Sequence, residues 1–589
     1  MSAPANRVIA VAVLIALLAA PFYLAPFTIT LLNYIGVYSL VALGLVLLTG
    51  IAGMVSFGQA SFMGIAAYAT AWTSALMGYS PWLGLVLAVA VTCTVAAILG
   101  AVTLRLQGHF LSLSTIAWGL ALYFTFGNIA GLGAYNGISS IPPVTIGSLP
   151  LVGSGQIFYL IWGMLLLSML AAHNLLGSRV GRAMRALRGG DALVESLGVN
   201  ALRIRLATFV IAALLAALSG WLIAHMSRFV SPTPFDVTMS IVFLMMAMVG
   251  GSGYLLGAVV GAALITLLKN WIQDILPILA PSTSGQLEIV VFSALFIVFL
   301  QRARDGIVPY IAQWLPEAER DRPPNAEPLP RRAQPEKGRV LMTVSAATRR
   351  FGGLIAVNDV TFDVRTGEIL ALIGPNGAGK TTMFNLITGA LRASSGRIVF
   401  ADEDITEAAA HRIALAGIAR TFQHVKLRPK MSLLDNVLLG AYGRTRAGFL
   451  AGALRLDGAE ERRARSEAMR QLDRVRLGGR PYDLAGNLPL GNQRLLEIAR
   501  ALAADPILLV LDEPAAGLRR QEKLALADLL RNLRAEGLTI LLVEHDMDFV
   551  MGLVDRIVVM DFGCKLCEGA PQAIRADARV QEAYLGGVT

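Results

Sequence analysis

The most chemically specific stretch of the sequence is a glycine-rich loop at residues 374–381, GPNGAGKT. It fits the pattern G-x-x-x-x-G-K-[ST], in which glycines let backbone N–H groups point at a phosphate. Lys380 would reach the β- and γ-phosphates of a nucleotide, and the Thr381 hydroxyl would coordinate Mg²⁺. The nucleotide-binding residues predicted from this stretch are Gly374, Pro375, Asn376, Gly377, Ala378, Gly379, Lys380, Thr381 and Thr382.

Two adjacent acids supply a second part of the same chemistry. Asp512 and Glu513 follow the apolar run 507–511, which predicts a buried strand. Such a strand can deliver Asp512 to the metal ion of a nucleotide, and Glu513 is then placed to polarise the attacking water. Taken alone, the pair could equally be an exposed acidic turn, but the glycine-rich loop upstream favours the catalytic interpretation.

The elements around the loop have the order that phosphate binding needs. The apolar run 369–373 predicts a buried strand directly before the loop, and a helix is expected from about Lys380. A strand, a glycine-rich loop and a helix in succession place the positive end of the helix dipole at the phosphate.

The composition of the first half of the chain indicates that it lies in lipid rather than in water. The protein has 589 residues, 55% of them hydrophobic, and a mean hydropathy of +0.62. Charges are sparse from residue 8 to residue 300 and dense afterwards. A membrane-spanning helix needs about 20 mostly apolar residues. Candidate spans are residues 8–25, 31–50, 57–77, 82–104, 110–130, 157–176, 206–225, 237–249, 255–268 and 289–300, the last three being short.

Two details refine this membrane half. The run 8–25 follows Arg7 like a signal peptide, but further apolar runs come after it, so a retained first membrane helix is the better interpretation. The stretch 51–56, between the second and third runs, is itself mostly apolar, and glycine there predicts a broken helix buried in protein rather than facing lipid. The spacing of Gly257 and Gly261 suits close helix packing.

Arginines orient the predicted spans. Arg7, Arg105, the cluster at residues 179–205 and the pair Arg302 and Arg304 fall on one side if every span crosses. That side is cytoplasmic by the positive-inside rule, and the loops 131–156, 227–236 and 270–287 then face outward. The rule also accounts for much of the net charge of +10, and no nucleic-acid-binding motif occurs in the sequence.

Two other features of the sequence are not predicted to take part in a reaction. Residues 306–340 contain seven prolines among charged residues and predict a semi-extended linker. Cys564 and Cys567 have C-x-x-C spacing, but the chain holds only one further cysteine, Cys93. Two thiols on a surface hairpin are therefore favoured over a zinc site.

With these motifs placed, residues 341–589 resemble the nucleotide-binding domain of an ABC transporter. The resemblance implies roles for three more residues. Gln423 matches the glutamine that contacts Mg²⁺ and water and faces the membrane domain. His545 matches the switch histidine that contacts the γ-phosphate, and Phe351 lies where an aromatic ring stacks on adenine.

The chain departs from that family at two places. The signature motif is usually L-S-G-G-Q, and the matching stretch here is LPLGN at residues 488–492. Pro489 replaces the serine, and Asn492 replaces the glutamine, whereas Gly491 can still offer its backbone N–H. Arg519 stands near the place of an aspartate. In this family each ATP lies between the phosphate loop of one domain and the signature of another, so Gly491 and Asn492 would serve a partner's nucleotide.

Both halves resemble the importers of branched-chain amino acids. In the second half the resemblance rests on the arginine-rich helical segment 436–480, LAGN at 484–487, EIAR at 497–500 and EAYL at 582–585. In the first half it rests on residues 38–70 and 181–224, including RAMRALR at 182–188. It implies a cytoplasmic coupling helix within residues 191–201 that docks near Gln423.

These observations predict an α-helical polytopic membrane domain at residues 1–305, a linker at 306–340 and an α/β P-loop ABC nucleotide-binding domain at 341–589. The implied function is ATP-driven import of branched-chain amino acids or related small polar solutes across a bacterial cytoplasmic membrane, with the ATPase inside. Urea, amides, or aromatic or carboxylic acids are alternative substrates, and an ATP-gated regulatory membrane protein is a rival function. ATP and Mg²⁺ are the expected cofactors. Expected partners are an extracytoplasmic solute-binding protein, membrane lipid, and a second permease and ATPase or a second copy of the chain, with no nucleic acid.

Overall fold

The computed structural model describes residues 4–105, 109–279, 286–303, 305–313, 322–323 and 325–585. Arg304 and parts of the predicted linker and of the loop 270–287 therefore lie outside the described residues. The chain forms two compact units. The first comprises Met1–Leu176 and Leu202–Arg320, and the second comprises Gly177–Ala201 and Asp321–Thr589.

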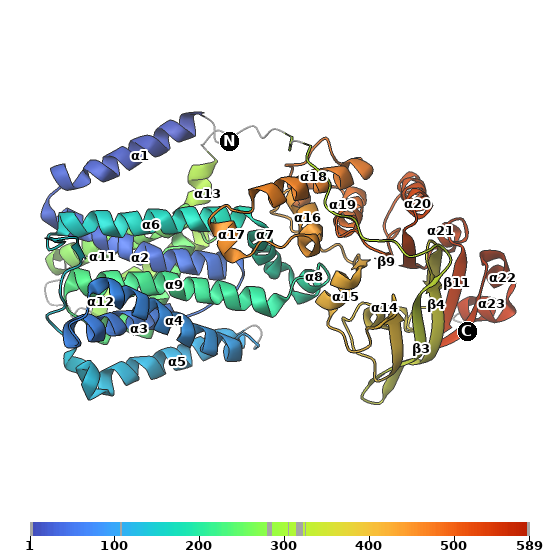
Figure 1. The fold of residues 1–589 in the computed structure, drawn as a ribbon, viewed down its shortest axis with the longest axis horizontal. Helices are drawn as coiled ribbons and strands as arrows, with labels where there is room; N and C mark the ends of the chain where they lie inside the picture. Colours follow the sequence, from blue (N-terminus) through green and yellow to red (C-terminus); the bar gives the residue numbers. More distant parts are fainter. Residues whose placement is uncertain are drawn as a thin grey trace. The chain divides into compact units, whose positions relative to one another are not determined.

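The first unit is helical (Figure 1). Within its described residues, six helices are long and apolar enough to cross a membrane. The helices in this unit are α1 Pro4–Tyr23, α2 Pro26–Leu45, α3 Gln59–Ala71, α4 Pro81–Thr103, α5 His109–Asn128, α6 Ser154–Gly177, α9 Ala201–Ser227, α10 Val237–Gly251, α11 Leu255–Leu279, α12 Gln286–Arg302 and α13 Ile307–Ala312. Each of the ten apolar runs coincides with a helix, and α11 extends well beyond the run 255–268.

The broken helix predicted at residues 51–56 is confirmed. The π-helical segment Val46–Ile51 continues α2, and irregular, mostly buried backbone follows it until α3 begins at Gln59. The close helix packing predicted for Gly257 and Gly261 is also confirmed. A Cβ on Gly261 would lie 1.8 Å from the carbonyl oxygen of Met246, so α10 and α11 approach closely only because this position lacks a side chain.

The second unit contains two sheets. Five parallel strands and one antiparallel strand form the larger sheet, in the order β12-β11-β5-β10-β9-β8. Its strands are β5 Ile369–Ile373, β8 Ile418–Arg420, β9 Leu508–Asp512, β10 Thr539–Val543, β11 Arg556–Asp561 and β12 Cys564–Gly569. The smaller sheet is antiparallel, in the order β4-β3-β6-β7, with β3 Val340–Phe351, β4 Leu354–Arg365, β6 Ser395–Phe400 and β7 Glu403–Asp404.

Helices cover these sheets and form a separate helical region. They are α7 Arg179–Ala186, α8 Asp191–Glu195, α14 Lys380–Ile387, α15 Ala410–Ala416, α16 Leu433–Gly440, α17 Phe449–Ala453, α18 Gly458–Arg474, α19 Leu490–Leu502, α20 Arg520–Ala535, α21 Met547–Met551, α22 Pro571–Ala576 and α23 Ala578–Leu585. The predicted helical character of residues 436–480 is thus confirmed by α16, α17 and α18. Cys564 and Cys567 lie on the antiparallel β11–β12 pair as free thiols.

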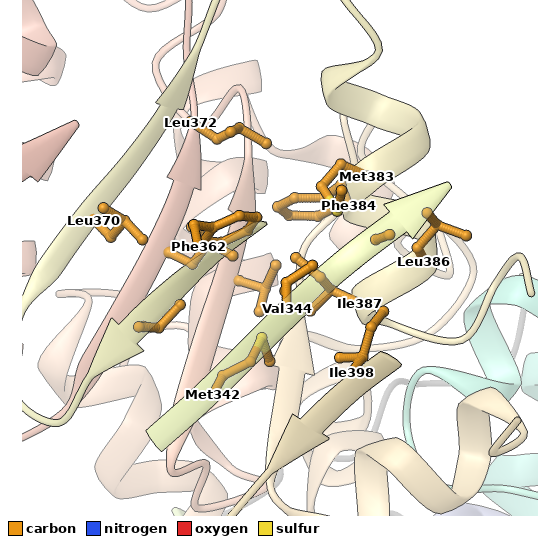
Figure 2. Close-up of a cluster of buried hydrophobic side chains, with 14 of the residues drawn as sticks. Met342, Val344, Phe362, Leu370, Leu372, Met383, Phe384, Leu386, Ile387 and Ile398 are labelled. Atoms are coloured by element: carbon orange, nitrogen blue, oxygen red, sulfur yellow. The ribbon is translucent and has the colours of Figure 1, made fainter. Parts of the chain in front are cut away.

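A buried apolar cluster fixes the helix that carries the phosphate loop. Met383 and Phe384 of α14 pack between the two sheets, against Leu372 of β5 and Phe362 of β4 (Figure 2). Both are fully buried, so the start of α14 cannot shift without opening this core. The fold thereby holds the loop before α14 at the end of β5.

The linker predicted at residues 306–340 is only partly extended: residues 307–312 form the helix α13, which the prediction missed, whereas residues 325–336 have neither helix nor strand and are not a free chain. Leu329 is buried in the apolar cluster of α16, α18 and α19. The guanidinium of Arg444 donates to the carbonyl oxygens of Leu329 and Pro330, both at 3.1 Å. The linker therefore follows the surface of the helical region.

Candidate nucleotide site

The predicted site residues meet because their strands are parallel. Gly374 follows β5, His545 follows β10, Asp512 ends β9, and Gln423 comes shortly after β8. The four strands are neighbours in the order β5-β10-β9-β8. Their carboxyl ends therefore lie along one edge of the sheet, which is the usual place for a ligand in open α/β sheets.

Lys380 is held within the loop that precedes it. Its ammonium donates hydrogen bonds of 2.8 Å to the carbonyl oxygens of Gly374 and Pro375. Burial lowers the pKa of Lys380, and the carboxylates of Glu513 and Asp512 oppose that shift. Gly379 has φ of +91° and a Cβ there would lie 2.3 Å from the carbonyl oxygen of Ala356, so only glycine fits. Thr381 and Asn376 are exposed at the start of α14.

Asp512 has an unusual environment for a carboxylate. It is 3% exposed, and its Oδ1 atom is buried without a hydrogen-bond partner among the described residues. Burial raises its pKa to about 6, against the attraction of Arg420. A buried oxygen that lacks a partner is costly unless another ligand completes it. The arrangement fits the predicted role of Asp512 as a cation ligand.

Glu513 and His545 face each other across the ends of β9 and β10. The Nδ1 atom of His545 lies 3.8 Å from Oε2 of Glu513. Glu513 has φ of +46°, which is uncommon for a residue other than glycine, and its N–H donates to the carbonyl oxygen of Val543 at 2.9 Å. The side chain of His545 is 57% exposed, so it remains accessible to a nucleotide.

Sequence reasoning did not assign a role to Glu544, which the structure places at the centre of this site. Glu544 is fully buried, and burial raises its pKa. One carboxylate oxygen accepts the N–H of Ala515 at 2.7 Å, and the other accepts the N–H of His545 at 3.2 Å. Glu544 thus links the turn after Glu513 to the backbone of His545. A charged residue directly after the apolar strand 539–543 was the signal in the sequence.

The loop that carries Gln423 is tied to α19. Arg494 donates to the carbonyl oxygens of Phe422 at 2.8 Å and Gln423 at 2.6 Å. Arg500, also buried, donates to the carbonyl oxygen of Lys426 at 2.6 Å and pairs with Glu497. The side chain of Gln423 itself is exposed. Arg494 and Arg500 were not predicted to act here, because the carbonyl oxygens that they bind lie 71 to 74 residues away in the sequence.

Phe351 lies at the end of β3, in the smaller sheet, and is 43% exposed. The guanidinium of Arg349 covers its ring at 4.6 Å from the centroid. An exposed ring that already stacks on a cation is suited to a flat aromatic ligand. Its contact with adenine remains a prediction.

The signature stretch begins α19 and lies against α20. Pro489 precedes the first turn, Leu490 is exposed, and Asn492 is partly buried. A Cβ on Gly491 would lie 2.5 Å from Oε1 of Glu522, so a carboxylate rests against this glycine. The same carboxylate accepts the N–H of Arg519 through Oε2 at 2.8 Å. The negative charge of Glu522 opposes the binding of a phosphate at Gly491.

Residues 177–201 pack within the second unit. The guanidinium of Arg182 forms two hydrogen bonds with Glu461 of α18, at 2.7 and 2.9 Å, and its side chain is only 2% exposed. Arg179 donates to the carbonyl oxygens of Tyr442 and Ala447. The helix α8 contacts α15, and Gly189 lies against Arg428, five residues after Gln423. A basic segment between two membrane helices is therefore bound to the helical region.

Family models match most of the chain. Residues 27–300 match the permease component of the branched-chain amino acid transport system, and residues 357–516 match the ABC transporter model. Residues 564–588 match the model described as branched-chain amino acid ATP-binding cassette transporter.

Individual proteins are similar to the second unit. The high-affinity branched-chain amino acid transport ATP-binding protein LivG of Escherichia coli is 43% identical over 251 residues, which cover 42% of this chain and 98% of that protein. The corresponding protein BraF of Pseudomonas aeruginosa gives the same identity and coverage. A crystal structure of a nucleotide-free ATP-binding cassette from an ABC transporter is 31% identical, covers 42% of this chain and 99% of that chain, and has a TM-score of 0.37.

The helical unit and the nucleotide site define a membrane permease fused to an ABC ATPase. The chain belongs to the branched-chain amino acid transport family of ABC transporters, and it carries permease and ATP-binding parts in one polypeptide.

Proposed function

We propose that this chain imports branched-chain amino acids, or related small polar solutes, across a bacterial cytoplasmic membrane at the expense of ATP. The observation that carries the proposal is the match of both units to one transport system, the first to its permease component and the second to its ATP-binding proteins. The six long apolar helices and the convergent nucleotide site support the same conclusion.

The residues at the sheet edge fit Mg²⁺ and ATP. The loop 374–380 and Thr382 would bind the phosphates, with Phe351 stacking on adenine. Thr381, Gln423 and Asp512 would coordinate Mg²⁺, which screens the phosphate charge. Asp512 is suited to that role because its buried Oδ1 lacks any other partner among the described residues. Glu513 would orient and polarise the attacking water, and His545 would contact the γ-phosphate.

The working complex needs more than one copy of each unit. One chain supplies one permease unit and one ATPase unit, and an ABC importer uses two of each. The chain would pair with a second permease and a second ATPase, or with itself. A solute-binding protein outside the membrane would deliver the substrate. Residues 177–201 would transmit ATPase motion to the membrane helices, since they are bound to the helical region near the Gln423 loop.

Two other functions define the limits of this proposal. The same machinery could carry urea, amides, or aromatic or carboxylic acids. An ATP-gated regulatory role, without transport, is favoured by no specific residue among those described.

Uptake measurements test the proposal. Cells that lack the chain should lose uptake of labelled leucine, isoleucine and valine, and the wild-type gene should restore it. The Glu513→Gln variant should reach the membrane at normal levels but restore little uptake, because the attacking water is no longer activated. Unchanged amino-acid uptake in the deletion strain would refute import of these substrates. Loss of urea or amide uptake instead would identify the alternative substrate.

A further inference from the structure

A cavity of about 210 Å³ lies inside the first unit, between α2, α3, α9 and α10 and the segment that joins α9 to α10. Three large buried side chains form part of its wall, those of Met63, Phe235 and Phe243. Ser227 and Phe229 are exposed and stand at its mouth. The cavity is thus open on one side and closed by large apolar groups on the other.

The walls of the cavity are held in place. The ring of Tyr38 contacts that of Phe243 edge to face, with centroids 5.4 Å apart. Phe235 packs against Gly64, where an added Cβ would lie 2.9 Å from its ring. Aromatic rings fixed in this way make a preformed wall, and a preformed site loses less entropy when a ligand binds.

The lining selects for an apolar group of limited size. None of the described residues that line the cavity is charged, and its hydroxyl groups belong to Tyr34, Tyr38, Ser227 and Ser231. A cavity of about 150 Å³ with aliphatic and aromatic walls holds a molecule the size of benzene. The present cavity can therefore hold the side chain of leucine, isoleucine or valine. A strongly polar solute without an apolar group would lose its hydration there without compensation, which disfavours urea.

The position of the cavity along the helices suits uptake. The segment 227–236 is a predicted outward loop, so the mouth faces outside. Tyr38, one turn further along α2 than Tyr34, and Phe243, one turn further along α10 than Met239, close the inner end.

A polar side chain lies beyond the apolar end. Gln59 stands one turn before Met63 on the same face of α3, and both polar atoms of its buried side chain lack partners among the described residues. An unpaired amide in this place can form hydrogen bonds with the polar end of a solute that has moved inward.

We propose that this cavity binds the aliphatic side chain of the transported amino acid, and that Met63, Phe235 and Phe243 determine its specificity. This inference rests on the proposed function, because it names the substrate-contacting part of the same transporter. The charged amino and carboxylate groups stay at the hydroxyl-lined mouth, while the side chain occupies the apolar end.

Photolabelling and uptake test the site together. The complex is isolated through a tag on the full-length chain from its native membrane and reconstituted in liposomes. Photo-leucine, a leucine analogue with a diazirine in its side chain, should label peptides within α2, α3 or residues 223–243, and excess leucine should remove the label.

In cells, Met63→Trp should reduce leucine uptake at least about tenfold, because the indole fills the cavity. Ser231→Trp at the mouth should do the same. The control Ser148→Trp, on an exposed turn away from the cavity, should behave as wild type.

Enlarging the cavity should shift the specificity towards larger substrates. Phe243→Ala should raise the kcat/KM ratio of phenylalanine to valine about tenfold, since a larger side chain gains room. Normal leucine uptake by both tryptophan variants, or label confined to other helices, would overturn the site while leaving amino-acid import intact. A wild-type chain that takes up no hydrophobic amino acid would overturn the proposed function itself.

Discussion

Glu544 illustrates what a buried carboxylate does at the residue scale. Its two oxygens accept N–H groups from Ala515 and His545, on the two turns that present the predicted catalytic pair. The carboxylate thus bonds to the backbone that carries those groups. Its contribution to hydrolysis is therefore to position other groups.

We predict that Glu544→Ala slows ATP hydrolysis at least about tenfold, because the catalytic pair loses its placement, and destabilises the ATPase unit. Two buried N–H groups would lose their acceptor, at a cost of about 1–3 kcal/mol each. Glu544→Gln, whose amide oxygen can still accept one N–H, should fall between Glu544→Ala and wild type. ATP turnover by the complex with its partner subunits and thermal unfolding of the full-length chain measure the two effects. The control Glu403→Ala removes an exposed carboxylate at β7, and equal behaviour of Glu544→Ala and this control would contradict the prediction.

At the scale of elements, α19 joins the signature stretch to the loop of Gln423. Arg494 and Arg500 together donate to the backbone carbonyl oxygens of three residues in that loop, and both arginines are buried. A rotation of α19 would therefore carry the loop with it. These hydrogen bonds couple the movement of α19 to that of the Gln423 loop.

We predict that Arg494→Met lowers the amount of solute transported per ATP hydrolysed. Methionine keeps an apolar stem but loses both N–H donors, so the loop can move separately from α19. Energetic coupling of this kind amounts to about 0.5–2 kcal/mol, which corresponds to a reduction of about 2- to 30-fold. Arg494→Lys, with one remaining donor group, should lie between. The ratio of labelled uptake to phosphate release in proteoliposomes is the measurement, and an unchanged ratio in Arg494→Met would refute the coupling.

The ion pair between Arg182 and Glu461 attaches residues 177–201 to α18. We predict that Arg182→Glu and Glu461→Arg each abolish most uptake, because breaking a buried pair costs about 3–5 kcal/mol. The double variant restores opposite charges and should recover a substantial part. Uptake normalised to membrane content reports this double-mutant cycle. The exposed pair Arg392 and Glu407 provides the control, since its reversal should change little. Equal losses in the double and single variants would mean that the pair does not bind the segment.

Some of these elements could be predicted from the sequence and others could not, for physical reasons. The phosphate loop and the strand ending at Asp512 were predictable, because glycines, buried apolar runs and adjacent acids leave local patterns, whereas the role of His545 was predicted only from the family resemblance. The break before α3 was predictable from its glycines. Glu544 had a local signal, its place after the apolar strand, but its bond to Ala515 was not predictable, and neither were the bonds of Arg494 or the pair of Arg182 with Glu461, because those partners lie far away in sequence. The cavity lined by Met63 and Phe243 was hidden for the same reason, since aromatic and apolar residues in membrane helices usually pack against one another.

At the scale of the whole molecule, we propose that the chain carries two unequal halves of an ATP site. The loop 374–381, Asp512, Glu513 and His545 are in place on its sheet edge. The signature stretch has Pro489 where a serine hydroxyl would contact the γ-phosphate, and Glu522 rests against Gly491. A partner ATPase with an intact signature would therefore complete the site on this chain's phosphate loop, and the opposite site would be weaker.

We predict that one of the two sites performs most of the hydrolysis. The purified chain alone, in lipid, should hydrolyse ATP much more slowly than the complex with its partner subunits, and Glu513→Gln should abolish most activity of that complex. Combining Pro489→Ser with Asn492→Gln should raise the activity of the chain alone, because the serine hydroxyl and the glutamine restore contacts to a second copy's nucleotide. The matched control is Pro481→Ser, outside the signature stretch in the helical region, which should leave that activity unchanged. Hydrolysis by the chain alone at the rate of the full complex, abolished by Glu513→Gln, would refute the asymmetry, because two copies would then form competent sites without a partner signature.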